Sequence, residues 1–233
     1  MRPLETPTLG SDLRLRALLA TLHLASPALP VGGFAYSQGL ESAIAEAIVS
    51  DAASARRWID DLLVQVLARF EAPLWLRAFD ACAARDFERF AAINAELLAA
   101  RETAELRAET RQMGASLLRL FPTFELALPV AEPQAIAYPA AFAAACCGLG
   151  VDREAGLTAH LWSWVENQVL AAVKTLPLGQ QAGQAMLLAL QASIVRAVQI
   201  AVNLPDAQLG SLPVAFALCS ARHESLYSRL YRS

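Results

Sequence analysis

The chain has 233 residues, of which 56% are hydrophobic and 18% are charged, and its formal net charge is −3. This length provides one sizeable domain or two, and the slightly acidic balance excludes the electrostatic surface of a nucleic-acid-binding protein. The low charged fraction indicates either apolar surface that partners cover or simply an alanine-rich helical core.

Proline and glycine residues divide the sequence into helical segments, and no convincing alternating strand pattern is present. In the first half, residues 1–12 are expected to be flexible, Ser50 or Asp51 is a candidate N-cap, and Pro73 either kinks a helix or begins the next one. The helices predicted in this half cover residues 13–24, 36–48, 87–100 and 104–120, and a further helix begins after the cap at Ser50 or Asp51 and runs into residues 58–70.

In the second half, prolines make a connector over residues 126–138, and Pro139 suits the first turn of a helix. Asp152 is a good N-cap for a long helix that runs through Lys174. The helices predicted after the connector cover residues 140–147, 152–174, 180–203 and 214–222. These segments predict an all-α fold, a single-domain bundle of about ten helices over residues 13–222, with a C-terminal segment over residues 223–233.

Three uncharged stretches, residues 17–40, 133–151 and 175–195, are candidates for a membrane span. Proline, glycine or glutamine residues interrupt each of them, so no clean apolar run of about 20 residues forms. The N-terminus carries charges and prolines where a signal peptide needs an apolar segment. The four cysteines lack the spacing of a disulfide framework. The sequence therefore predicts a cytoplasmic protein that does not enter a membrane.

The sequence contains no catalytic constellation. Its single lysine, Lys174, follows Ala-Ala-Val, so the glycines of a phosphate-binding loop are missing. The pair His223-Glu224 begins an HExxH zinc motif, but Tyr227 stands where the second histidine is needed. We therefore predict a protein that is not an enzyme and that has no cofactor or fixed metal site.

Acidic side chains are interpreted as groups on the polar faces of helices. Glu105 and Glu109, in the stretch RETAELRAETRQ, are spaced to pair with arginines of the same helix. The arginines in question are Arg101, Arg107 and Arg111. Such pairs give a solvated helix surface and do not predict a binding site.

Three stretches are unusual for a plain scaffold. The loop SPALPVGGFAYSQGLES is either a helix connector with buried aromatic residues or a binding loop. Lys174, followed by LPLGQ, is the one lysine among many arginines. Its presence is either an accident of composition, which is favoured on general grounds, or it has a role that the planar guanidinium of an arginine cannot fill. The C-terminal HESLYSRLYRS is rich in residue types that anchor interfaces, and it either packs on its own bundle or binds a partner.

These stretches together resemble a known family. The blocks LASPALPVGGFAYSQGLE, RETAELRAETRQMGASLL, LWSWVENQVLAAVKTLPLGQQAGQ and HESLYSRLYRS are similar to those of the urease accessory protein F (UreF) family, and they occur in the family's order. The resemblance implies an all-α, homodimeric, non-catalytic protein. It also implies that the protein binds the accessory protein UreD/UreH and recruits the GTPase UreG, and that this assembly delivers nickel to apo-urease.

The same resemblance implies where the partners bind. The C-terminal segment is expected to contact UreD/UreH with Arg229 as an anchor, and Lys174 is expected to lie near the GTPase. Nickel is expected to pass through the complex without stable binding. The alternative is an all-α protein-interaction or apolar-ligand-binding module of another system. The implied partner-binding residues are Tyr36, Ser37, Gln38, Glu41, Lys174, Gln180, Tyr227, Arg229, Leu230 and Arg232.

The C-terminal segment is also predicted to be mobile in the free protein. Leu226 and Leu230 are four residues apart, as are Tyr227 and Tyr231, so each pair could share a helix face. So short a segment should bury too little surface to offset its ordering entropy before UreD/UreH binds. Deleting residues 226–233 is then expected to leave the thermal stability almost unchanged.

Overall fold

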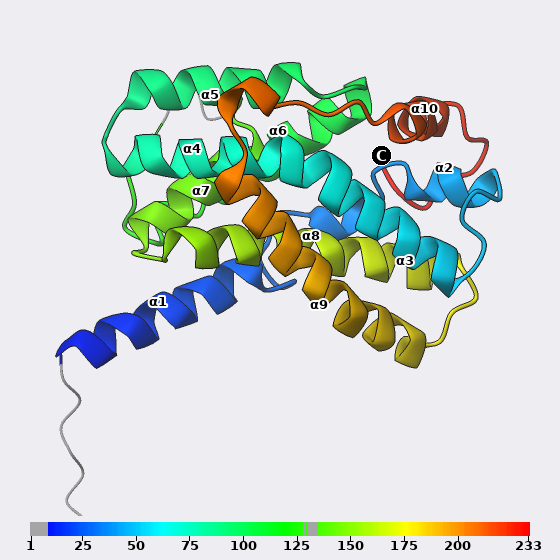
Figure 1. Ribbon diagram of the computed structural model, residues 1–233, viewed down its shortest axis with the longest axis horizontal. Helices are drawn as coiled ribbons and strands as arrows, with labels where there is room; N and C mark the ends of the chain where they lie inside the picture. The colour runs from blue at the N-terminus through cyan, green and yellow to red at the C-terminus, as the bar shows by residue number, and fades with distance from the viewer. Residues whose placement is uncertain (1–8, 128, 130–134) are drawn as a thin grey trace, which may run out of the picture.

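The computed structural model describes residues 9–127, 129 and 135–233, which form a helical bundle (Figure 1). No strand occurs among these residues. The all-α fold that the sequence predicts is confirmed. The α-helices are α1 (Leu9–Ala25), α2 (Leu40–Ala45), α3 (Ala52–Asp61), α4 (Glu71–Ala83), α5 (Phe87–Ala99), α6 (Ala104–Leu118), α7 (Tyr138–Gly148), α8 (Arg153–Thr175), α9 (Gln180–Asn203) and α10 (Val214–His223).

Side chains that accept backbone N–H groups fix the starts of several helices. Asp51, one of the two candidate caps, accepts the Ser54 N–H at 2.7 Å, and the Ser54 side chain completes a capping box. Asp152 accepts two N–H groups at the start of α8, as predicted. Pro73 lies in the first turn of α4, where a missing N–H group costs nothing. These signals are local, which is why the sequence revealed them.

The core is built around α7, whose side chains are buried along almost all of its length. Its alanines are small, so α4 and α6 approach it closely. Gly114 of α6 shows how close the backbones lie, because a β-carbon there would be 2.5 Å from the Ile136 carbonyl oxygen. The bulkiest fully buried side chains are Trp75, Phe90, Phe121 and Phe142.

Two predicted helices differ from the observed elements. The helix expected over residues 36–48 is confined to α2, and a 3-10 turn, Gly33–Ala35 (η1), and a loop precede it. Gln38 in that loop has a φ of 52°, a left-handed conformation that no α-helix contains. The helix expected over residues 58–70 is α-helical only to Asp61 and continues as a π-helical turn, Leu62–Val66 (η2).

Helix α1 projects from the body of the bundle (Figure 1). It begins at Leu9, so residues 9–12 are helical where the sequence predicted flexibility, and residues 1–8 lie outside the described part of the chain. More than half of the surface of five leucines on α1 is exposed, namely Leu13, Leu15, Leu18, Leu19 and Leu22. This apolar surface agrees with the first of the two interpretations of the composition.

Helix α9 is the one helix of the described residues that is long and apolar enough to cross a membrane. It packs against α8, α3 and α4, and Leu190, Ile194 and Ala197 lie in the core. A core helix of a bundle has the same length and composition, so this pattern alone does not indicate a membrane span.

Candidate functional site

A buried carboxylate fixes the path of the C-terminal segment, residues 223–233. The backbone N–H groups of Leu230 and Tyr231 donate to the two oxygens of Glu41 on α2, at 2.7 and 3.1 Å. Glu41 is only 7% exposed. A carboxylate removed from water needs hydrogen-bond donors, and the backbone of the segment supplies two.

A buried histidine joins this carboxylate to a second one. His223 lies with its Nε2 atom 3.1 Å from Glu41 and its Nδ1 atom 2.7 Å from Glu105 on α6. The other oxygen of Glu105 accepts a hydrogen bond from Arg229 at 2.6 Å. The interpretation of Glu105 as a solvated group on a helix surface is therefore wrong, since its side chain is 16% exposed and binds the C-terminal segment.

The last residue of the sequence is held by the loop before α2. The Ser233 carbonyl oxygen accepts the N–H groups of Ser37 and Gln38, at 2.8 and 3.0 Å, and the Ser37 hydroxyl at 2.6 Å. The Ser233 hydroxyl donates to Glu109 of α6 at 2.6 Å. Burial raises the pKa of Glu109, and the Ser233 and Gln38 hydrogen bonds oppose that rise. Glu109 is thus a second acidic residue of α6 that faces inward.

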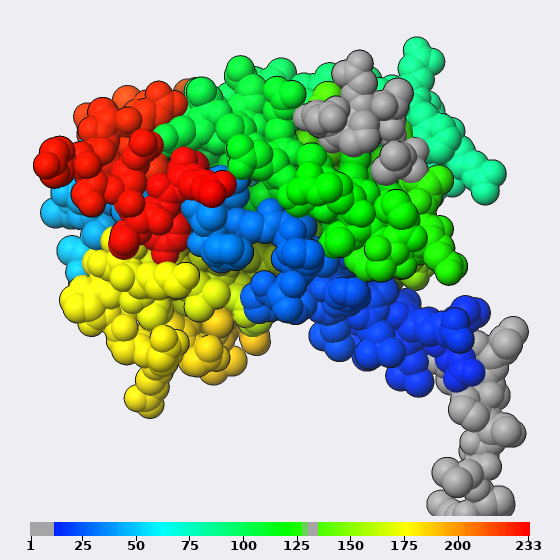
Figure 2. Space-filling model, turned by 180° about the vertical axis from the view of Figure 1, so that it is seen from behind, coloured from blue at the N-terminus to red at the C-terminus, as the bar shows by residue number. Residues whose placement is uncertain are grey.

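The segment held in this way presents two apolar side chains to solvent. Tyr227 is fully exposed and Leu230 is 71% exposed. Tyr231 is buried instead, with its phenol beside the Thr175 hydroxyl at the end of α8. Figure 2 shows the C-terminal segment (red) beside the turn between α8 and α9 (yellow) and the loop before α2 (blue).

The partner-binding residues implied by the resemblance lie on or beside the C-terminal segment, in the loop before α2 and at the turn between α8 and α9, but they differ in exposure to solvent. Tyr36 is buried, and Arg232 is exposed while its backbone N–H donates to Ala35 at 2.9 Å. Lys174 is exposed in the last turn of α8, and Gln180 is exposed at the start of α9. Three of the residues hold the segment rather than face solvent, namely Ser37, Gln38 and Glu41.

The packing of the C-terminal segment corrects the prediction that it is mobile. That prediction counted the apolar burial of a short helix, whereas the residues after α10 form no helix. Hydrogen bonds to buried carboxylates hold the segment, and side-chain periodicity does not reveal such bonds. The related expectation, that deletion of residues 226–233 leaves the stability unchanged, loses its basis.

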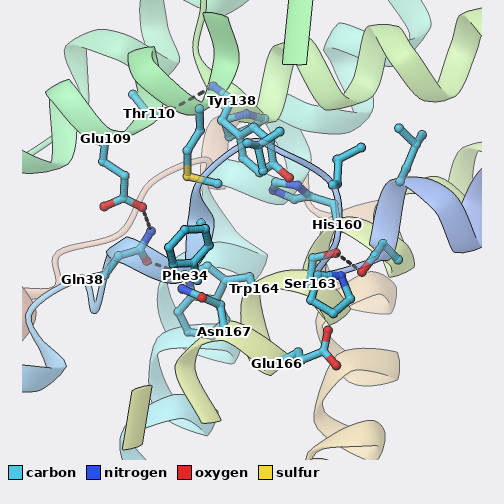
Figure 3. A pocket seen from close by; sticks show the side chains of 18 of the residues that line it. Phe34, Gln38, Glu109, Thr110, Tyr138, His160, Ser163, Trp164, Glu166 and Asn167 are labelled. Carbon is cyan, nitrogen blue, oxygen red and sulfur yellow. Dashed lines mark hydrogen bonds between the residues drawn. The ribbon is translucent and has the colours of Figure 1, made fainter. Parts of the chain in front are cut away.

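A cavity of about 120 Å³ lies beside this site, under the loop that connects α1 and α2 (Figure 3). Phe34 is 68% exposed at this cavity. Gln38 donates to Glu109 at 2.5 Å and accepts from the Trp164 indole at 2.6 Å, which links the wall of the cavity to the C-terminal segment. The apolar part of the lining includes Leu24, Leu29, Val31, Phe34, Met113 and Leu170.

The polar part of the lining contains an ionic network. Glu71 forms an ion pair with Arg101, and its second oxygen lies 3.1 Å from the His160 Nε2 atom. Burial by itself raises the pKa of Glu71, but the Arg101 charge and the His160 hydrogen bond outweigh burial and hold the pKa at about 2. Glu71 is therefore ionised at neutral pH, and its charge is paired.

Sequence reasoning named Glu41 as a partner-binding residue but missed the inward-facing Glu71, Glu105 and Glu109 and the histidines that they contact. The one available signal was the four-residue spacing of Glu105 and Glu109, which places both on one helix face. His223 and Glu71 gave no signal, because their partners are distant in the sequence. Among the described residues, no group of three or more His, Cys, Asp or Glu side chains is arranged to hold a metal ion.

Comparisons with known proteins agree with one another. The model of the UreF family matches residues 49–191. A urease accessory protein UreF from Cupriavidus necator is 48% identical over 228 residues, covering 94% of this chain and 99% of that protein. One from Azoarcus sp. is 46% identical, covering 94% and 97%. A bifunctional urease accessory protein UreEF from Bordetella bronchiseptica is 45% identical, covering 98% of this chain and 55% of that longer protein.

Proposed function

Because this chain belongs to the UreF family of urease accessory proteins, we propose that it assists the maturation of urease as a non-catalytic, cytoplasmic scaffold. In this proposal it forms a homodimer, binds the accessory protein UreD/UreH and recruits the GTPase UreG. Nickel is the cargo of the assembly and passes to apo-urease. The bifunctional UreEF name of one relative supports association with other urease accessory proteins.

One observation carries the proposed contact with UreD/UreH. The C-terminal segment is held by its backbone, at Leu230, Tyr231 and Ser233, while the side chains of Tyr227 and Leu230 point to solvent. Tyrosine is enriched in interfaces, and a segment that is already ordered loses little entropy on binding. A fixed backbone with exposed apolar side chains is therefore suited to bind a protein partner.

The turn between α8 and α9 is the proposed contact with UreG. It carries Lys174, the single lysine of the chain, and Gln180, and both side chains are exposed. Tyr231 reaches Thr175, so the C-terminal segment and this turn are neighbours. An ammonium group on this surface would attract an acidic region of the GTPase.

The test uses two exposed residues whose loss does not affect the core. The double variant Tyr227→Ala, Leu230→Ala should fold normally and lose co-elution with UreD/UreH in size-exclusion chromatography. Leu188→Ala on α9 is a matched control, because Leu188 is 70% exposed and lies on another helix. Full co-elution of the double variant, or equal loss with the control, would contradict the proposed surface.

A second candidate function rests on the cavity under the loop between α1 and α2. Its volume of about 120 Å³ is close to that of a cavity, roughly 150 Å³, known to take a benzene-sized ligand. An apolar-ligand-binding module would retain such a ligand through purification. Native mass spectrometry of the purified protein tests this: a bound small molecule that is lost in Phe34→Ala would favour the second function over the first.

A further inference from the structure

The ring of His223 lies between two carboxylates. The side chain of His223 is fully buried, and each of its ring nitrogens faces a carboxylate oxygen, of Glu41 at 3.1 Å and of Glu105 at 2.7 Å. A neutral imidazole has one N–H donor and one lone pair, whereas a carboxylate only accepts. With both carboxylates ionised, the neutral ring would direct a lone pair at one of them, and only the imidazolium donates to both.

His160 provides a contrast within the same protein. It is also buried, and its Nε2 atom faces Glu71, but its Nδ1 atom has no hydrogen-bond partner among the described residues. A neutral ring with the proton on Nε2 satisfies Glu71. A buried histidine next to one carboxylate therefore does not need to be an imidazolium. At His223 the second carboxylate adds this requirement.

The C-terminal segment depends on the same two carboxylates. Glu41 accepts the backbone N–H groups of Leu230 and Tyr231, and Glu105 accepts from Arg229. The charged groups that face His223 are thus Glu41 from α2, Glu105 from α6 and Arg229 from the segment. Three further charged groups lie nearby: Glu109, which binds Ser233, and the ion pair of Arg222 with Glu46.

The charge balance of this cluster changes with one proton. With the imidazolium, two cations face two carboxylates, and the buried charges are paired. Without the second ring proton, Arg229, which pairs with Glu105, is the one cation left in the cluster for two carboxylates. The repulsion between the two carboxylates is stronger in the protein interior than in water. Loss of that proton should therefore move Glu41 and Glu105 apart and release the backbone that they hold.

We propose that His223 is a positioning residue whose imidazolium bridges Glu41 and Glu105, and that the C-terminal segment is released when this histidine loses its second ring proton. The bridge needs both ring protons, so docking of the segment and protonation of His223 are coupled. The consequence for partner binding rests on the proposed function, but the docking itself does not.

Nuclear magnetic resonance of the isolated protein tests the docking. The chain has three histidines, so 15N-histidine labelling gives a small set of signals to assign. Both nitrogens of His223 should be protonated where the Leu230 and Tyr231 amides are protected from hydrogen exchange. As the pH rises, loss of the second proton and faster exchange of these amides, roughly tenfold beyond the intrinsic increase, should coincide. Protected amides beside a neutral His223 would overturn the proposal.

Two variants separate a positioning role from a general structural one. His223→Phe keeps a ring but cannot bridge, so the two amides should exchange fast at every pH, whereas the exposed His23→Gln should behave as the wild type. In Glu105→Gln, the amide can donate to a neutral ring, so the segment should stay docked to higher pH than in the wild type. An unchanged or lower release pH in Glu105→Gln contradicts the proposal even if His223→Phe fails to fold.

Binding of UreD/UreH over the same pH range separates the two proposals. Weaker binding that follows the release of the segment supports both. Release of the segment with no UreD/UreH binding at any pH contradicts the proposed function and leaves the role of His223 in place. If UreD/UreH binds normally and docking of the segment does not depend on the protonation of His223, the role of His223 is contradicted and the proposed function is not.

Discussion

His223 and Glu41 lie 3.1 Å apart although 182 positions separate them in the sequence. Helices α3 to α9 lie between the two residues along the chain, so the contact is a long-range one that depends on the tertiary fold. The surface that we propose to bind UreD/UreH is therefore a product of tertiary structure. Variants at its anchoring residues should act on binding through the position of the segment.

Arg229→Ala is expected to weaken UreD/UreH binding while changing stability little. The Arg229 side chain is 40% exposed, and such ion pairs contribute at most about 1 kcal/mol to stability. Without it, Glu105 loses a cation and the segment becomes less ordered, so calorimetry should show binding weakened by at least about 1 kcal/mol. Arg229→Lys keeps the charge and should recover part of the loss. Unchanged affinity in Arg229→Ala would show that this residue does not position the segment.

Glu71 should make the protein sensitive to acid. Its pKa is lowered from 4.5 to about 2, so its ionised form stabilises the fold above pH 4.5 and that stabilisation disappears as the pH falls toward 2. The difference corresponds to about 3 kcal/mol. Urea unfolding between pH 3 and 7 should show this slope in the wild type, and Glu71→Gln should be less stable at pH 7 with a shallower slope. The exposed Glu154→Gln serves as control, and an equal slope in both variants would contradict the assignment.

Lys174→Ala should leave the fold intact and alter the activity of the proposed complex with UreD/UreH and UreG. The side chain is exposed at the C-terminal end of α8, where a cation gains about 0.3–1 kcal/mol from the helix dipole. Circular dichroism and the proposed dimer should therefore be unchanged, whereas nickel delivery or GTP hydrolysis by UreG in the complex should change. Lys174→Arg tests whether charge alone suffices. Unfolding of Lys174→Ala, with normal behaviour of the folded remainder, would identify the lysine as structural.

Gly114→Ala should destabilise the contact between α6 and the two residues that precede α7. The added β-carbon would lie 2.5 Å from the Ile136 carbonyl oxygen and 3.1 Å from the Ala137 carbonyl carbon, so the backbone itself must move. A cost of about 1–3 kcal/mol is expected in thermal or urea unfolding. Gly179→Ala is the control, since its β-carbon meets no atom within 4 Å. Equal stability of the two variants would mean that α6 lies less close to the residues before α7 than described.

The sequence predicted most helices because their signals are local. The caps at Asp51 and Asp152 and the proline at Pro139 stand within a few residues of the helices that they delimit. The stretch after Ala35 was predicted as a helix from the same signals, but Gln38 is held in a left-handed conformation by distant partners, Glu109 and Trp164. Tertiary hydrogen bonds override local propensity there.

The candidate site was only partly predictable. The composition of the C-terminal segment pointed to an interface, and the exposure of Tyr227 and Leu230 is compatible with one. What fixes the segment could not be predicted, because a Glu on a helix has the same local pattern whether it faces water or a buried backbone. Glu105 and Glu109 were accordingly interpreted as surface residues.

The separation along the sequence between Glu41 and the backbone that it binds also determines how early in synthesis this contact can form. Tyr231 follows Glu41 by 190 residues, so at typical rates of synthesis about 10–40 s pass before the ribosome adds the partner of this carboxylate. During that interval Glu41 lacks the backbone donors of Leu230 and Tyr231. A chain that stops before residue 230 can complete the helices of the bundle but not its docking surface. Incomplete chains should therefore fail to compete with complete ones for the partner.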